Sequence, residues 1–162
     1  MKNKILYLTR GAAVAALYVL LTYLSSLLAL DKGVIQFRLS EALCILPIFM
    51  PEAIPGLFIG CFVANFLTGS LFLDVVFGSI ATLIGAIGAR LLRKISPKHI
   101  WIATLPTVFA NALIIPFVLK YVYLVPDLIP FMMLTVGAGE VVCASVLGTA
   151  LYFSLKKSYF NK

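Results

Sequence analysis

Charged residues are scarce in this 162-residue sequence, in which Asp, Glu, Lys and Arg together make up 12%, about half their share in soluble domains. Acidic residues are scarcest, with six in the whole chain. So few charges do not supply the polar surface that a soluble enzyme or DNA-binding domain needs. Disordered chains are poor in apolar residues, so this composition also excludes disorder.

Residues for metal binding and nucleophilic catalysis are also few. The one histidine, His99, lies in a basic segment, where we expect it to be solvated. Cys44, Cys61 and Cys143 are far apart within apolar runs, so we expect buried packing residues and not a disulfide framework or a metal site. The sequence has no P-loop and no HExxH motif. We therefore expect no catalysis, metal or cofactor in this chain.

Apolar residues are abundant, at 62% of the sequence, and the mean hydropathy is +1.09. A membrane span needs roughly 20 apolar residues, and apolar runs cover residues 5–30, 42–73, 74–92, 100–123 and 128–155. The run 42–73 is too long for one span, and Pro47, Pro51 and Pro55 are expected to break it near residues 50–55. We predict an all-α polytopic membrane protein, a compact bundle of six transmembrane helices forming a single domain over residues 1–162.

The positions of the basic residues support six spans over five. With six spans, one side of the membrane holds 10 of the 13 Lys and Arg residues, and the other side holds Lys32, Arg38 and Lys120. Five spans would place the cluster at residues 90–98 outside, against the positive-inside rule. We therefore expect both termini to be cytoplasmic in the plasma membrane. The basic residues form no single patch, so we expect no nucleic-acid partner.

Six polar or charged residues lie within or at the ends of the predicted spans. They are Arg38, Glu41, Asn65, Asp74, Asn111 and Glu140. Such groups are costly in a bilayer and usually mark a site. From a rise of about 1.5 Å per residue, Glu41 and Asp74 should lie at the outer boundary and Asn111 and Glu140 near mid-depth. The pattern predicts a cup that opens outward above an apolar floor, and not a polar-lined pore.

Structural interpretations of these residues remain open. Arg38 and Glu41 could pair at a helix start, Asp74 could cap a helix, and Asn65 or Asn111 could bridge neighbouring helices. Glu140 is hardest to explain in this way, because Gly137-Ala138-Gly139 leaves space around its carboxylate. Glu52 lies at the opposite side of the membrane, where we expect a structural role.

Specific motifs in the first half of the chain resemble those of a known family. Residues 36–43 read QFRLSEAL and are followed by Leu46-Pro47 and Pro51-Glu52-Ala53. Further matching positions are Gly56-Leu57, Gly60-Cys61, Asn65, Asp74 and the segment 77–83, FGSIATL. Over about residues 8–155 the sequence resembles the QueT family, most densely over residues 36–83.

This resemblance implies an S component of an energy-coupling factor (ECF) transporter, which captures a queuosine precursor, a 7-deazaguanine, outside the cell. The implied partners are a transmembrane T component and two cytoplasmic ATPase subunits. Ala12 and Ala16 resemble the small-residue motif by which S components dock on the T component. We expect the ligand to be bound by Phe37, Arg38, Glu41, Asn65, Asp74, Asn111 and Glu140, with the loop 31–40 as a lid.

Other functions remain possible at this point. The chain could be an S component for another vitamin, such as riboflavin or thiamine. It could be an independent proton-coupled carrier, which would need Glu140 as its titratable group. It could also be a membrane scaffold without a ligand.

Overall fold

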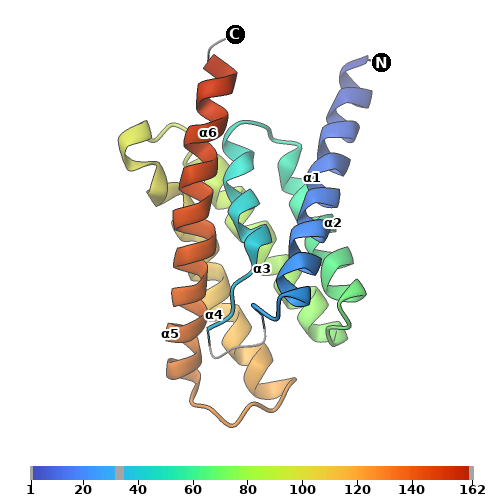
Figure 1. Ribbon diagram of the computed structural model, residues 1–162, viewed down its shortest axis with the longest axis vertical. Coiled ribbons are helices and arrows are strands. Elements are labelled where there is room, and N and C mark those ends of the chain that lie inside the picture. The colour runs from blue at the N-terminus through green and yellow to red at the C-terminus, as the bar shows by residue number, and fades with distance from the viewer. Residues whose placement is uncertain (1, 32–34, 161–162) are drawn as a thin grey trace.

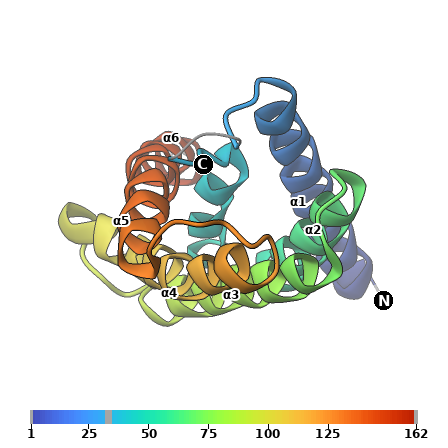
Figure 2. The same cartoon turned by 90° about the horizontal axis from the view of Figure 1, so that it is seen from below.

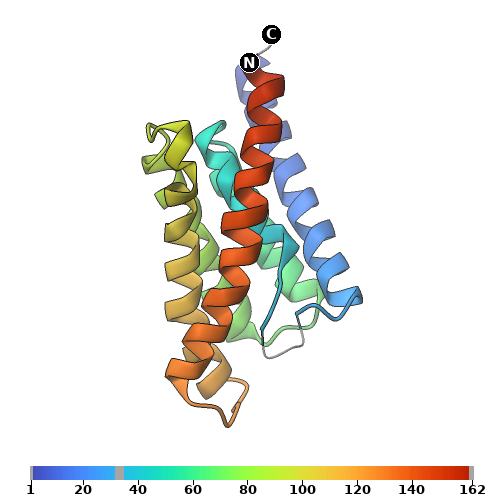
Figure 3. The same ribbon diagram turned by 60° about the vertical axis from the view of Figure 1, so that its left-hand side comes forward.

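The computed structural model describes residues 2–31 and 35–160, and its regular elements are helices. In chain order they are α1 (Lys2–Leu27), η1 (Leu39–Ile48), α2 (Ala53–Leu67), α3 (Phe72–Leu91), η2 (Pro97–Thr104), α4 (Leu105–Tyr121), α5 (Ile129–Glu140), η3 (Val141–Leu147) and α6 (Gly148–Phe160). Because η2 leads directly into α4, and α5, η3 and α6 form one continuous rod (Figure 3), these elements make the six helices that the sequence predicts.

Four helices are long and apolar enough to cross a membrane: Lys4–Leu27, Phe72–Leu91, Pro97–Tyr121 and Ile129–Lys157. The other two, η1 and α2, are apolar but shorter, with 10 and 15 residues. The 3₁₀ geometry of η1 lengthens it, because a rise of about 2.0 Å per residue carries its residues about 20 Å, against about 15 Å in an α-helix. The chain is an all-α multi-pass membrane protein.

The break predicted near residues 50–55 lies between η1 and α2, at residues 49–52. Two arginines hold this turn. Arg10 of α1 forms an ion pair with Glu52 at 3.2 Å, so Glu52 has a structural contact, as expected. Arg90 donates hydrogen bonds to the carbonyl oxygens of Pro47 and Ile48 at 3.0 and 3.1 Å, where a helix leaves carbonyls without intrahelical partners.

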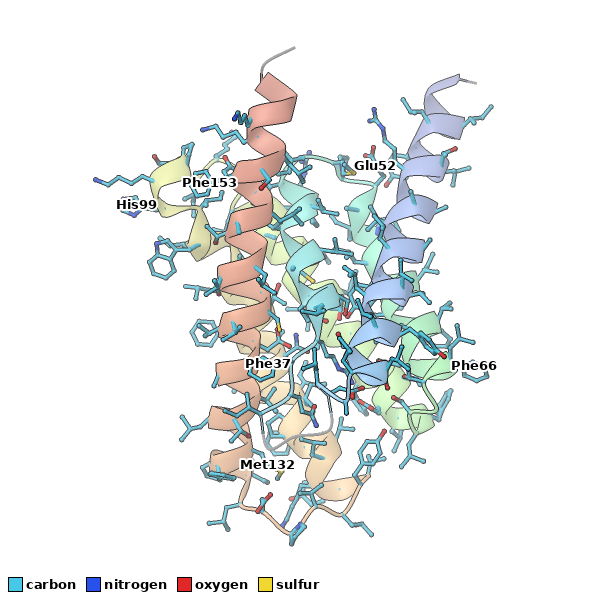
Figure 4. The ribbon with its side chains drawn as sticks, in the orientation of Figure 1. Phe37, Glu52, Phe66, His99, Met132 and Phe153 are labelled. Atoms are coloured by element: carbon cyan, nitrogen blue, oxygen red, sulfur yellow. The ribbon has the colours of Figure 1, made fainter. Side chains whose placement is uncertain are left out.

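Both termini lie at one end of the bundle, which we call the terminal end (Figure 1). The turn at residues 49–52 is at this end, and Figure 4 shows Glu52 there beside α1. The segments 28–31, 68–71 and 122–128 lie at the opposite, distal end (Figure 1). Of the basic residues counted above, Lys32 and Lys162 lie outside the described residues. His99 is exposed, and Figure 4 shows it on the outside of the bundle.

The short helix η1 is the centre of the bundle. It contacts α1, α2, α3, η3 and α6, and Figure 2 shows it between α1 on one side and the α5–α6 rod on the other. Its apolar side chains Leu43, Cys44 and Leu46 pack with Leu57 and other buried residues of α1, α2 and α3. The three cysteines are free and buried, as predicted.

Two glycines allow close packing of α2 on α1. A Cβ atom at Gly56 would lie 2.5 Å from the Gly11 carbonyl oxygen, and one at Gly60 would lie 3.0 Å from the Ala15 backbone. Gly11 and Ala15 therefore face α2. Ala12 and Ala16, on the next stripe of α1, are exposed on the outside of the bundle.

Candidate functional site

A polar cavity of about 350 Å³ opens at the distal end of the bundle, within the size range of small-molecule sites. Its wall comes from α1, the segment before η1, the α2–α3 turn, α3, α4 and the segment after α4. The lining residues are Thr22, Ser26, Asp31, Gln36, Arg38, Thr68, Gly69, Ser70, Asp74, Ile115, Leu119, Tyr123 and Val125.

Arg38 lines this cavity, at the point where the extended chain enters η1. Its Nη1 atom donates a hydrogen bond to the Asn65 side-chain oxygen at 3.2 Å. The negative charges of Asp74 and Glu41 act on its guanidinium. Arg38 therefore does not simply pair with Glu41 at the start of a helix, because it also interacts with Asn65 of α2 and Asp74 of α3.

Asp74 forms one wall of the cavity together with Tyr123. The Tyr123 hydroxyl donates to Asp74 Oδ2 at 2.9 Å and accepts the backbone N–H of Leu71 at 3.1 Å. Burial raises the pKa of the Tyr123 hydroxyl, so this group remains a donor at neutral pH. Asp74 is in the first turn of α3, where the helix dipole favours a carboxylate. Its free lone pairs remain available to a molecule in the cavity.

Glu41 lies deeper in the bundle than Arg38 and is 2% exposed. Tyr18 of α1 donates its hydroxyl to Glu41 Oε1, and Cys44 donates to Oε2 at 3.2 Å. The prediction that Glu41 lies at the outer boundary is wrong. Tyr18 precedes the last residue of α1, Leu27, by nine positions, which places this contact about 14 Å inside the bundle. The physical reason is that residues 35–38 enter the bundle as extended chain. Helix η1 therefore begins well inside the bundle and not at its distal end.

Glu140 ends α5 near mid-depth, as predicted, and is 8% exposed. Its Oε2 atom has no hydrogen-bond partner within the described residues. The Asn111 side chain is close enough to act on the Glu140 carboxylate, and its amide donates a hydrogen bond to the Thr107 carbonyl oxygen at 3.2 Å. Its preceding residue must be glycine, because a Cβ atom at Gly139 would lie 2.0 Å from the Gln36 carbonyl oxygen.

The structure brings together six of the seven residues that the sequence singled out for the ligand. Arg38 and Asp74 line the cavity, and Asn65, Glu41, Glu140 and Asn111 lie behind this wall, close to Arg38 or to one another. Phe37 is the exception, because its side chain lies beside the α5–α6 rod in Figure 4. The aromatic residue at the cavity is Tyr123 instead. Residues 32–34 of the predicted lid lie outside the described residues.

The charges of the cluster do not balance. One cation, Arg38, faces three carboxylates, Glu41, Asp74 and Glu140, so the net charge is −2 when all four are ionised. A buried excess of one sign is costly unless it is compensated. The cluster therefore favours a molecule that is rich in N–H donors or carries positive charge. Within the described residues, no group of three or more His, Cys, Asp or Glu side chains could hold a metal ion.

Sequence reasoning missed the residues that support this cluster from behind. Tyr18 is completely buried and sits among apolar neighbours in α1. Its hydroxyl also lies 3.5 Å from the hydroxyl of Thr82, which donates to the Cys61 thiol at 3.4 Å. The available signal was a tyrosine in the middle of a predicted span, since a buried tyrosine hydroxyl usually has a hydrogen-bond partner.

Known proteins resemble this chain over much of its length. The family model described as QueT transporter matches residues 8–157. A protein of Lactococcus lactis subsp. cremoris (strain MG1363), described as "Queuosine precursor transporter QueT", is 37% identical over 101 residues. The aligned part is 62% of this chain and 59% of that protein, so the match spans less than two thirds of the relative. No solved structure matches this chain.

Proposed function

The chain belongs to the QueT transporter family, and on this premise we propose that it captures a queuosine precursor, a 7-deazaguanine, in the distal cavity. We propose further that it is the S component of an ECF transporter and works with a T component and two ATPase subunits. The name of the Lactococcus relative supports the substrate class. The observation that carries the proposal is the cavity together with the carboxylate-rich cluster around Arg38 at its wall.

The chemistry of the cluster matches the edges of a 7-deazaguanine. The guanine edge presents adjacent N–H donors, which one carboxylate can accept in a bidentate arrangement. Glu41 and Glu140 are the candidates for this contact. The ring carbonyl accepts hydrogen bonds, which Arg38 or the Asn65 and Asn111 amides can donate. A 7-aminomethyl group would be cationic and would suit Asp74, with Tyr123 available to stack on the ring.

The distribution of polar groups supports uptake from outside. The cavity is at the distal end, and the basic residues are concentrated at the terminal end, which the positive-inside rule assigns to the cytoplasm. Between the cluster and the terminal end, Ile45, Ile100, Ala103 and Tyr152 form a packed apolar cluster. A closed floor of this kind fits an S component that topples in the membrane and does not fit an open channel.

The direct test is ligand binding by the purified chain. Native mass spectrometry would reveal a copurified ligand, and calorimetric titration with 7-aminomethyl- and 7-cyano-7-deazaguanine, riboflavin and thiamine would identify the class. We expect a deazaguanine to bind and guanine-like competitors to displace it. Binding of riboflavin or thiamine alone would favour another vitamin, and uptake by vesicles that lack the ATPase module would favour an independent carrier.

A matched pair of substitutions tests whether binding occurs in this cavity. Asp74→Asn removes a charge from the cavity wall and should weaken binding of the 7-aminomethyl compound by about tenfold, the loss expected for one charged hydrogen bond. Asp127→Asn removes the same charge from an exposed position at the same end and should leave affinity unchanged. Equal effects of the two substitutions would contradict binding in the cavity.

A further inference from the structure

Resting on the proposed function, we propose that Tyr18 of α1 is a positioning residue for the ligand site: it fixes the Glu41 carboxylate for ligand binding. Tyr18 does not line the cavity, and Glu41 lies behind Arg38, which does. Its influence on a ligand would pass through its hydrogen bond to Glu41 Oε1.

The hydrogen bonds around Glu41 determine which way its carboxylate faces. Tyr18 from α1 holds Oε1 and Cys44 from η1 holds Oε2. A hydroxyl is a stronger donor than a thiol, so Tyr18 makes the stronger of these two contacts. Each carboxylate oxygen has two lone pairs, and Tyr18 and Cys44 each use one of them. The remaining lone pair on each oxygen can accept an N–H group of a ligand.

The Tyr18 hydroxyl also has a neighbour on a third element. The Thr82 hydroxyl of α3 lies 3.5 Å from it, and the single Thr82 proton can go either to Tyr18 or to the Cys61 thiol of α2. Tyr18 and Glu41 are 0% and 2% exposed, so water does not compete for their contact. A buried hydrogen bond of this kind fixes a side chain far better than a solvated one. Carboxylate orientation at Glu41 therefore depends on helices α1, α2 and α3 together.

The test is a double-mutant cycle on ligand binding with 7-aminomethyl-7-deazaguanine as the probe. Tyr18→Phe keeps the ring and its packing and removes the hydroxyl. We expect it to weaken binding about tenfold in the wild-type background and to have almost no further effect in the Glu41→Gln background. Titrations that extend to millimolar probe keep the weakened variants measurable. Tyr23→Phe, on the exposed face of the same helix, is the control and should be silent.

Each outcome supports or overturns the inference. Equal losses in the two backgrounds would show that Tyr18 acts independently of Glu41, as a merely structural residue would, and no loss in the wild type would also overturn it. If Tyr18→Phe does not fold, Thr82→Val tests the same contact from α3 and should give a smaller loss that disappears with Glu41→Gln. A wild-type protein that binds no deazaguanine would overturn the proposed function and, with it, this inference.

Discussion

At the scale of single residues, the cluster is organised by Arg38. It is the one cation among three buried carboxylates, and it donates a hydrogen bond to Asn65 of α2. Removing one partner of a buried charge cluster is usually more damaging than the net contribution of the cluster suggests, because the remaining charges lose their compensation. Arg38 therefore has a structural role before any ligand arrives.

This role predicts a specific pattern of stability. Arg38→Gln should lower the free energy of unfolding by about 2 kcal/mol, less than for a fully buried pair because Arg38 faces the cavity. Adding Glu140→Gln removes one of the uncompensated charges and should recover part of the loss. Thermal unfolding of the single and double variants in the same detergent measures both effects. A double variant that is less stable than Arg38→Gln would contradict this account of the charges.

At the scale of elements, glycine residues permit close contacts between helices. Gly56 and Gly60 place α2 directly against the backbone of α1, and small residues at such contacts allow packing to hold helices together in lipid. Gly139 does the same for the chain segment that enters η1. The position of the polar cluster therefore depends on two contacts that contain no polar side chain.

A pair of glycine substitutions tests this packing. Gly56→Ala places a methyl group 2.5 Å from the Gly11 carbonyl oxygen, and the required backbone shift should cost about 2 kcal/mol of stability. Gly137→Ala is the matched control, since its new methyl would lie 3.6 Å from the Ala112 Cβ atom, an ordinary contact. We expect it to be neutral or slightly stabilising, as alanine is the better helix former. Thermal unfolding of both proteins distinguishes the two cases.

Helix positions were predictable from the sequence because proline and hydropathy act locally. Pro47, Pro51 and Pro55 place the break between η1 and α2 correctly, and the depths of Asn111 and Glu140 follow from helical rise. The 3₁₀ form of η1 and the depth of Glu41 were not predictable, because they depend on how residues 35–38 pack against Gly139. The partner of Tyr18 was missed for the same reason, since it is 23 positions away in the sequence.

At the scale of the whole molecule, α1 presents two stripes of small residues to two environments. Gly11 and Ala15 pack on α2, and Ala12 and Ala16 face outward. The stripes are adjacent on the helix, yet substitutions in them should have different consequences. The inner stripe is needed for folding, and we propose the outer stripe as the docking surface for the T component.

Ala12→Leu should therefore abolish uptake by the assembled transporter while leaving binding of 7-deazaguanine to the isolated chain unchanged. Ala15→Leu, three positions away, should lower the stability of the chain itself, because it directs bulk at Gly60 of α2. Uptake in reconstituted vesicles, paired with titration of the isolated chain, separates these effects. Loss of ligand binding in Ala12→Leu would assign Ala12 to internal packing and contradict the docking proposal.

Tyr18 and Ala16 are two positions apart, so they project about 200° apart around α1, one towards the interior and the other towards lipid. One rigid helix thus carries both the support of the ligand site and the proposed docking surface. Thermodynamic linkage then imposes reciprocity: if ligand occupancy changes the affinity of α1 for its partner by some factor, docking must change the affinity for the ligand by the same factor. A partner that binds the empty chain more tightly would also promote release of the ligand.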